Sequence, residues 1–221
     1  MRIPLSHHGL REMACITAGC GLAAWGLAQV AWPLVLLPAA VETFGIAFFR
    51  DPERKLPQDG SVLVSPADGT VADVEEVAGT PLLPEPCLRV GIFLSVFDVH
   101  VNRAPLTGRV AGLKYQRGRY LDARDPAASR ENEAQDVLLH GALPVVVRQI
   151  AGLIARRIVC TLVEGAIVER GQRIGMIKFG SRTELLVPLR LQPRPLVKSG
   201  DRVRGTSSAL VAVAAQAGGG A

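Results

Sequence analysis

A chain of 221 residues has room for one domain, or for one domain with an appendage, and for a substantial hydrophobic core. Its net charge of +5 is not concentrated in a Lys/Arg block, which suits an anionic membrane surface better than a nucleic-acid groove. Only 5% of the residues are aromatic and the four cysteines form no CxxC pair, which argues against a base-stacking platform, a disulfide framework and a structural zinc site.

The first predicted element is an apolar stretch near the N-terminus. Residues 13–41 carry no charged side chain, and a helical membrane span needs about 20 such residues. A signal peptide would have a shorter apolar centre and a cleavage site, whereas this stretch leads directly into FFRDPERK. Basic residues flank both ends, so a hairpin of two short helices would keep both ends in the cytoplasm; one tilted span is the alternative. We predict an N-terminal anchor unit of residues 1–49, with the protein anchored in the cell membrane or bound at its surface through residues 13–49 and the active domain on the cytoplasmic side.

The sequence pattern of residues 50–208 is typical of a β domain. Short β-like runs are separated by Gly, Pro, Asp and Asn at intervals typical of a sandwich or a barrel. The fold class that we predict is mainly β (α+β), with a β-sandwich or half-barrel core. Residues 116–135 are polar and are predicted to form a long loop, and residues 209–221 to form a flexible tail.

One segment of this domain, VEGAIVERGQRIGMIKFGS, resembles the hammerhead turn of lipoyl and biotinyl carrier domains. Those carriers place a modifiable lysine at a hairpin tip. Lys178 lies instead within a strand-like run and lacks the carrier's flanking residues. The likeness therefore indicates lipoyl/biotinyl-like hammerhead character in the architecture, and not the carrier function.

The segment SVFDVHVNRAP combines apolar and polar residues in alternation. In an extended strand over residues 95–105, two opposite faces would carry Phe97, Val99 and Val101 on one side and Asp98, His100 and Asn102 on the other. A half-exposed strand with a solvated face explains the pattern equally well. His100 and His140 are the only histidines after the N-terminal segment, so few residues are available as a proton shuttle near neutral pH.

The Gly180-Ser181 pair lies between two hydrophobic runs in KFGSRTELLVP. A plain hairpin turn more often uses Asn-Gly or Asp-Gly. The pair is not the nucleophile elbow G-x-S-x-G, which links a strand to a helix. Gly-Ser is also an ordinary turn pair, so the dipeptide alone leaves packing and chemistry open. The role of Asp68 in SPADG is equally undecided, because an aspartate there could form an Asx-turn or orient an imidazole.

Five motifs taken in order give a specific resemblance. FFRDPER, SPADG, FDVHVNRAP, the pair Asn132-Glu133 and KFGS resemble the short bacterial and archaeal form of the phosphatidylserine decarboxylase proenzymes. The likeness covers about residues 45–190. Archaetidylserine decarboxylases share the pattern, so it implies the head-group chemistry more firmly than the lipid tail.

The resemblance implies that the chain cuts itself. Ser181 Oγ would attack the carbonyl carbon of Gly180, and β-elimination would separate a β chain, 1–180, from an α chain, 181–221. Residue 181 would become a pyruvoyl group, so that pyruvate made from Ser181 is the cofactor and no metal is needed. Its carbonyl would form a Schiff base with the serine head group. The products would be phosphatidylethanolamine and carbon dioxide. The enzyme would thus be a carboxy-lyase of phospholipid biosynthesis.

The resemblance also implies roles for other residues. His100 would be the acid/base, and Asp68 the aspartate that orients groups for maturation. Asn132 and Glu133 are candidates for substrate binding.

The chain departs from the better-studied form in FDVHVNRAP, where Arg103 stands in place of a second histidine. In that form the second histidine partners the aspartate and the serine. Here His100 alone would fill both roles, or His140 or a water molecule would assist. Arg103 and Arg182 are candidates for binding the lipid phosphate or the substrate carboxylate.

The implied partners are the chain's own β and α pieces, as a heterodimer or a dimer of heterodimers, together with phosphatidylserine and membrane lipid, and no nucleic acid. Two alternatives lead to other functions. A non-enzymatic, membrane-anchored hammerhead adaptor would need no serine at 181. A metallopeptidase of a duplicated β fold would need more ligands than His100 and His140, whose spacing matches no recognised zinc signature.

Overall fold

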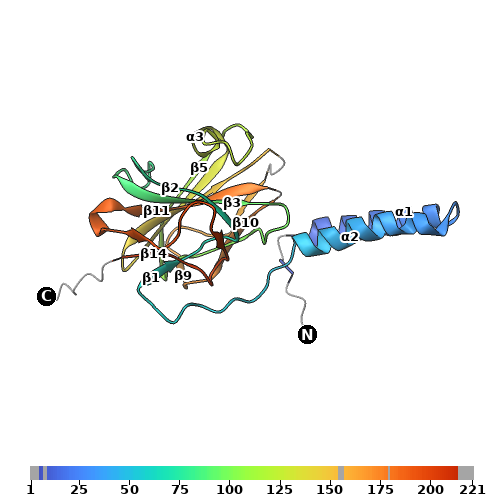
Figure 1. The fold of residues 1–221 in the computed structure, drawn as a ribbon, viewed down its shortest axis with the longest axis horizontal. Helices are drawn as coiled ribbons and strands as arrows, with labels where there is room; N and C mark the ends of the chain where they lie inside the picture. Colours follow the sequence, from blue (N-terminus) through green and yellow to red (C-terminus); the bar gives the residue numbers. More distant parts are fainter. Residues whose placement is uncertain (1–4, 7–8, 154–156, 179, 214–221) are drawn as a thin grey trace. The chain divides into compact units, whose positions relative to one another are not determined.

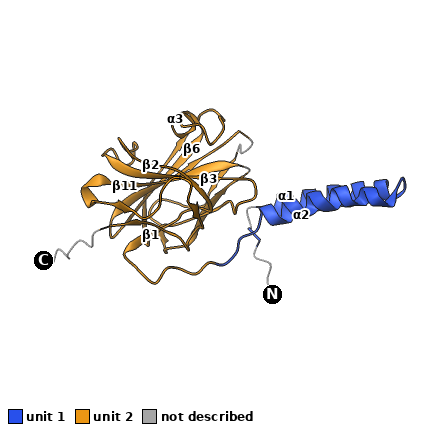
Figure 2. Cartoon of the chain, viewed as in Figure 1, with its two compact units in different colours: residues 1–53 blue, residues 54–221 orange. Residues whose placement is uncertain are grey.

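The structure is a computed structural model that describes residues 5–6, 9–153, 157–178 and 180–213. It divides into two compact units, residues 1–53 and residues 54–221 (Figure 2). The chain is continuous from Gly180 to Ser181, so the structure is that of the uncleaved precursor. Phe179, within the KFGS motif, and residues 214–221 of the expected tail lie outside the described residues.

The first unit consists of helices. These are α1 (Leu10–Ala28), the short 3-10 helix η2 (Trp32–Val35) and α2 (Leu36–Phe48), and α1 and α2 lie side by side (Figure 1). Gly45 permits a close approach, because a Cβ there would lie 3.2 Å from Ile16 Cδ1. Among the described residues, no helix is both long enough and apolar enough to cross a membrane. The membrane anchor over residues 1–49 stays a prediction.

The second unit is built from antiparallel strands. They are β1 (Val62–Val64), β2 (Gly69–Val77), β3 (Cys87–Leu94), β4 (Val101–Arg103), β5 (Gly108–Gln116), β6 (Ala134–Gly141), β7 (Pro144–Ile150), β8 (Ile158–Cys160), β9 (Ile167–Val168), β10 (Arg173–Ile177), β11 (Ser181–Pro188), β12 (Arg194–Pro195), β13 (Arg202–Val203) and β14 (Ala209–Ala212). An eight-stranded sheet has the order β13-β2-β3-β11-β7-β6-β5-β9, and two three-stranded sheets have the orders β1-β14-β12 and β4-β10-β8. The large sheet curls around the core (Figure 1), which confirms the mainly β fold. The helical pieces are α3 (Ala128–Glu131) and η3 (Leu189–Leu191).

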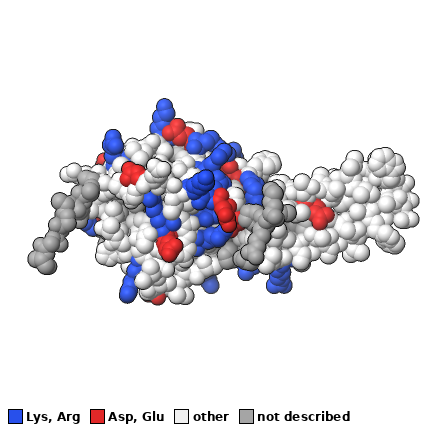
Figure 3. Space-filling model, turned by 90° about the horizontal axis from the view of Figure 1, so that it is seen from below, with Lys and Arg blue, Asp and Glu red and all other residues white. Residues whose placement is uncertain are grey.

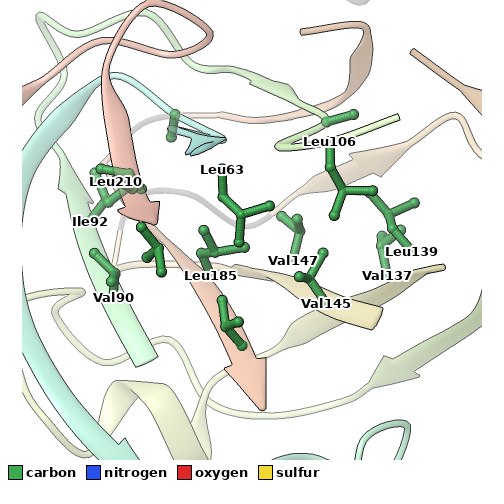
Figure 4. Close-up of a cluster of buried hydrophobic side chains, with 14 of the residues drawn as sticks. Leu63, Val90, Ile92, Leu106, Val137, Leu139, Val145, Val147, Leu185 and Leu210 are labelled. Carbon is green, nitrogen blue, oxygen red and sulfur yellow. The ribbon is translucent and has the colours of Figure 1, made fainter. Parts of the chain in front are cut away.

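The main core lies on one face of the large sheet. Branched side chains from β3, β6, β7 and β11 meet there, among them Val90, Ile92, Val137, Val147 and Leu185 (Figure 4). Side chains alternate between faces along a strand, so Ser181 and Thr183 share the face of Leu185, while Arg182 and Glu184 lie on the opposite face. Strand β11 is central, with Ser181 opposite Leu94 on β3 and Arg182 opposite Ile150 on β7.

The strand expected over residues 95–105 is wrong in its first half. A turn follows β3, and β4 begins only at Val101. Asp98 closes the turn, because its N–H donates to the Ser95 carbonyl and its carboxylate accepts the Ser95 N–H, both at 2.9 Å. Phe97 is therefore exposed at the turn instead of sharing a buried face with Val99 and Val101.

The flexible tail expected from residue 209 also begins too early. Residues 209–212 form β14, which pairs with β1 and β12. Leu210 and Val211 are fully buried in the main core. Burial of these two apolar side chains stabilises a strand in a segment whose low complexity suggested a tail.

Candidate active site

Ser181 is a buried residue with an unsatisfied hydroxyl. It opens β11 and is fully buried, and within the described part of the chain its Oγ has no hydrogen-bond partner. A buried polar group left in this state costs about 1–3 kcal/mol, and such a group needs an explanation. Gly180 precedes it with φ +66°, in the left-handed region that glycine adopts without a steric penalty. The hydroxyl is thus held beside a peptide bond that has unusual backbone geometry.

His100 lies against Gly180, the residue before Ser181. Its imidazole is fully buried, with Nδ1 2.9 Å from the Asp98 carbonyl oxygen and Nε2 3.2 Å from the Gly180 nitrogen. Because a carbonyl oxygen only accepts, Nδ1 carries the hydrogen, and Nε2 accepts the Gly180 N–H. The structure therefore brings His100, Gly180 and Ser181 together, with Nε2 bound to the N–H of the residue whose carbonyl precedes Ser181.

A buried polar network lies next to Ser181 on the core face. Asn102 Nδ2 donates to Thr183 Oγ1 at 2.9 Å, and Gln149 Nε2 donates to Asn102 Oδ1 at 2.8 Å. All three side chains are fully buried. Thr183 and Gln149 were not predicted as site residues, although the alternation along TELLVP places Thr183 on the face of Ser181. The role of Gln149 depends on the pairing of β7 with β11, which the sequence does not reveal.

The carboxylate of Asp68 is held by partners other than His100. Arg54 Nη2 lies 2.6 Å from Oδ2, and the Gly205 N–H donates to Oδ1 at 2.8 Å. Burial raises the pKa of this carboxyl, whereas the Gly205 N–H and Arg54 oppose the rise. The ring of His100 is oriented instead by the backbone carbonyl of Asp98. The maturation role of Asp68 stays a prediction.

Asn132 braces the loop over residues 117–133. Its buried Nδ2 donates to the carbonyls of Leu121 and Ala151, at 2.9 and 2.8 Å, and its Oδ1 accepts the Leu121 N–H. The next residue after Ala151, Gly152, lies against the Gly180 carbonyl: a Cβ at position 152 would be 2.2 Å from that oxygen. Asn132 thus supports the wall beside the candidate cleavage bond. Neither its position nor that of Gly152 was predictable from spacing.

Glu133 also has a partner within the loop. Its Oε2 accepts the hydroxyl of Tyr120 at 2.5 Å, and its backbone carbonyl accepts the Ala151 N–H at 2.9 Å. The first interaction lies within the polar loop, and the second joins the loop to the end of β7. This supports a bracing role for the Asn132-Glu133 pair, and their expected contact with substrate stays a prediction.

Arg182 is on the opposite face of the sheet from Ser181. Its fully buried guanidinium forms ion pairs with Asp73 at 2.6 Å and Glu184 at 2.7 Å. Gly91 makes room for it, since a Cβ there would lie 2.1 Å from Arg182 Nη2. The guanidinium of Arg182 is therefore neutralised by two carboxylates on the face of β11 opposite Ser181, and its expected contact with substrate stays a prediction.

His140 lies apart from the bond at Ser181, whereas the expected contact of Arg103 with substrate stays a prediction. Arg103 Nη1 donates to the Gly171 carbonyl at 3.1 Å. His140 is exposed, six residues along β6 from Ala134, which pairs with Ile150 beside β11. At about 3.3 Å per strand residue, that separation is about 20 Å.

A cavity of about 400 Å³ adjoins Gly180. Its lining is mostly apolar and consists of Phe93, Ser95, Val96, Phe97, Asp122, Ala123, Arg124, Leu153 and Gly180. Gly180 is thus the residue of the candidate cleavage bond that borders this cavity. Among the residues that the structure describes, no group of three or more His, Cys, Asp or Glu side chains is arranged to hold a metal ion.

Sequence comparison with known proteins points to one family. A sequence model of the phosphatidylserine decarboxylase family matches residues 41–210. A protein from Syntrophus aciditrophicus named phosphatidylserine decarboxylase proenzyme is 42% identical over 179 residues, covering 80% of this chain and 83% of that protein. Proteins of the same name from Pelobacter propionicus and Erythrobacter litoralis are 47% and 43% identical, covering 74% and 86% of this chain and 74% and 81% of their own lengths.

Proposed function

The chain belongs to the phosphatidylserine decarboxylase family, and from this premise we propose that Gly180, Ser181 and His100 carry out its self-cleavage and then its decarboxylation of phosphatidylserine. The observation that carries the proposal is the fully buried Ser181 hydroxyl. It lies without a partner among the described residues, beside a left-handed glycine whose N–H is bound by His100.

Self-cleavage begins at the carbonyl of Gly180. Ser181 Oγ attacks the carbonyl carbon, and His100 Nε2 takes the hydroxyl proton and returns it to the amide nitrogen of residue 181 as the C–N bond breaks. The chain is then joined by an ester. Loss of the Ser181 Cα proton and cleavage of the Cβ–Oγ bond release the Gly180 carboxylate and leave a dehydroalanine. Addition of water and loss of ammonia turn that residue into a pyruvoyl group.

The residues around position 181 fit a group made in place from the serine. When formed, the pyruvoyl carbonyl supplies the electron-withdrawing group that decarboxylation of an amino acid head group needs. His100 is then positioned to return a proton to the carbon that has lost carbon dioxide. The buried network of Asn102, Thr183 and Gln149 keeps the core side of the site polar and ordered. General acid–base help of this kind typically contributes about 10²–10⁴ in rate.

The cellular setting follows from the substrate. The family acts in membrane lipid metabolism, and we propose that the helical unit keeps the enzyme at the cytoplasmic face of the cell membrane, where phosphatidylserine lies. Large apolar side chains are exposed on its helices, among them Leu22, Trp25, Trp32 and Leu37. The working enzyme would be a β chain, 1–180, with an α chain, 181–221.

The test is the release of carbon dioxide from carboxyl-labelled phosphatidylserine. His100→Ala should lower self-cleavage or turnover by about 10²–10⁴. His140→Ala is the matched control, since it removes an exposed imidazole at the far end of β6, and it should stay within about threefold of wild type, less than 1 kcal/mol in the barrier. A crippled His140→Ala beside a normal His100→Ala would overturn the assignment. An adaptor would instead release no carbon dioxide and stay a 23.5 kDa chain.

A further inference from the structure

Two strongly exposed apolar side chains of the β unit line the cavity beside Gly180. Phe97 is 72% exposed and Leu153 is 59% exposed, and both belong to the lining of this cavity. Phe97 lies in the turn between β3 and β4, and Leu153 follows β7. Single exposed apolar side chains are ordinary, but these two come from separate segments and meet at one cavity that contains a residue of the cleavage bond. We call Phe97 and Leu153 the apolar rim.

The turn that carries Phe97 is tightly bonded. Ser95 and Asp98 exchange two hydrogen bonds of 2.9 Å, and Arg202 Nη2 donates to Asp98 Oδ1 at 2.8 Å. The phenylalanine is thus presented outward by an ordered turn. Its exposure follows from the bonding of its neighbours.

Charged groups beside the rim are already paired. Arg124, which lines the cavity, forms an ion pair with Asp122 at 2.6 Å and lies 5.9 Å from the centre of the Phe93 ring. Asp98 is paired with Arg202. The rim therefore offers apolar surface with balanced charge around it, which suits the region between lipid head groups and acyl chains better than a strongly charged partner.

The substrate gives this surface a function. The reactive residue is fully buried, so the serine head group has to leave the bilayer surface and enter the cavity, while the acyl chains stay in an apolar medium. We propose that Phe97 and Leu153 insert into the interface of a phospholipid bilayer, so that the head group passes from the membrane into the cavity beside Gly180. The inference rests on the proposed function and adds the way in which the substrate is presented.

The test compares two forms of one substrate with the full-length enzyme. Long-chain phosphatidylserine in phosphatidylcholine vesicles requires contact with a bilayer, whereas short-chain phosphatidylserine below its critical micelle concentration does not. For the double variant Phe97→Ser, Leu153→Ser we expect kcat/KM on vesicles to fall at least tenfold more than kcat/KM on the dispersed lipid. Phe97→Trp should preserve the wild-type ratio, because tryptophan also favours the interface.

Two matched controls remove apolar surface elsewhere. Val163→Ser and Ile167→Ser change side chains that are 66% and 70% exposed and do not line the cavity. Both should keep the wild-type ratio within twofold. Should the double variant not process itself, Phe97→Ser and Leu153→Ser are compared singly.

Three results would overturn the inference. An equal loss on both substrates would mean that the rim contacts a single lipid molecule. No loss on either would leave the rim without a role in turnover. A loss that accompanies a changed oligomeric state in solution would assign the rim to a second copy of the chain. Failure of the wild type to process or to release carbon dioxide would instead count against the proposed function, so the two failures are distinct.

Discussion

At the scale of single residues, the site depends on the absence of a side chain at Gly152. The Gly180 carbonyl oxygen occupies the space where a Cβ would stand, at 2.2 Å. This oxygen has to move as its carbon becomes tetrahedral in the attack by Ser181. The backbone of residues 151–152 is in turn held by Asn132 and Glu133 through Ala151.

We therefore expect Gly152→Ala to slow self-cleavage at least tenfold, because a backbone oxygen has little room to yield to the new methyl group. Gly60→Ala is the matched control, since nothing lies within 4 Å of a Cβ there. A gel time course measures cleavage, and hydroxylamine, which cuts an ester, shows whether the ester ever forms. Cleavage of Gly152→Ala at the wild-type rate would contradict this account of the carbonyl.

Asp68 gives a prediction that depends on pH. Burial raises the pKa of its carboxyl above 3.8 in the folded chain. A carboxyl with a raised pKa binds more protons when folded, so its contribution to stability is greatest below the unfolded pKa and is lost as pH rises through the folded pKa.

Relative to Asp68→Asn, the wild type should lose melting temperature as the pH rises from below 3.8 through the raised pKa of the folded chain. Thermal unfolding of both variants in a Ser181→Ala background, where the chain stays in one piece, measures the difference. If the wild type gains relative to Asp68→Asn over this range, the pKa shift has the opposite sign.

At the scale of elements, strand β11 organises the site. Its alternation sends Ser181 and Thr183 to the core face and Arg182 to an ion-pair cluster on the other face. The apolar runs and the spacing of turn residues were sufficient to predict a mainly β fold. They were insufficient at residues 95–98, where the hydrogen bonds between Ser95 and Asp98 interrupt an expected strand.

The candidate site was predictable from the sequence only where its residues lie in local motifs. Gly180, Ser181 and His100 lie in motifs that can be recognised along the chain, and the structure brings them together. Gln149, Gly152 and the bracing bonds of Asn132 depend on contacts between segments distant in sequence, and no local pattern marks them. The two carboxylate partners of Arg182 depend on the strand face that carries it, which its charge alone does not reveal.

The network next to Ser181 should have a measurable energy. Thr183→Val keeps the shape of the side chain but leaves the buried Asn102 amide without its acceptor, so we expect a loss of about 1–3 kcal/mol in the free energy of unfolding. Thr80→Val is the matched control, because the buried Thr80 Oγ1 has no hydrogen-bond partner among the described residues. Urea unfolding in the Ser181→Ala background measures both. Equal effects of the two changes would show that the network adds no stability.

At the scale of the whole molecule, the two units differ in surface character. In Figure 3, Lys, Arg, Asp and Glu side chains are scattered over the β unit, whereas the helical unit is almost free of charged side chains on the face in view. Exposed apolar side chains on helices favour contact with lipid.

Deleting residues 1–49 should move the protein from the membrane fraction to the soluble fraction, because the deletion removes the exposed apolar side chains of α1 and α2. Fractionation before and after a salt wash measures this. Arg11→Gln is a control that changes charge and leaves the apolar surface in place. Retention of the deleted form on membranes through the salt wash would place the anchor elsewhere.

The measurement that tests the central claim most directly is the intact mass of the purified protein beside that of Ser181→Ala. The account predicts two chains for the wild type, with masses of residues 1–180 and of residues 181–221 with a pyruvoyl group at residue 181, the smaller chain being blocked to Edman sequencing. It predicts one full-length chain for Ser181→Ala, which has neither nucleophile nor leaving group. An active wild-type enzyme with a single uncut chain, or a Ser181→Ala chain cut between residues 180 and 181, would contradict it.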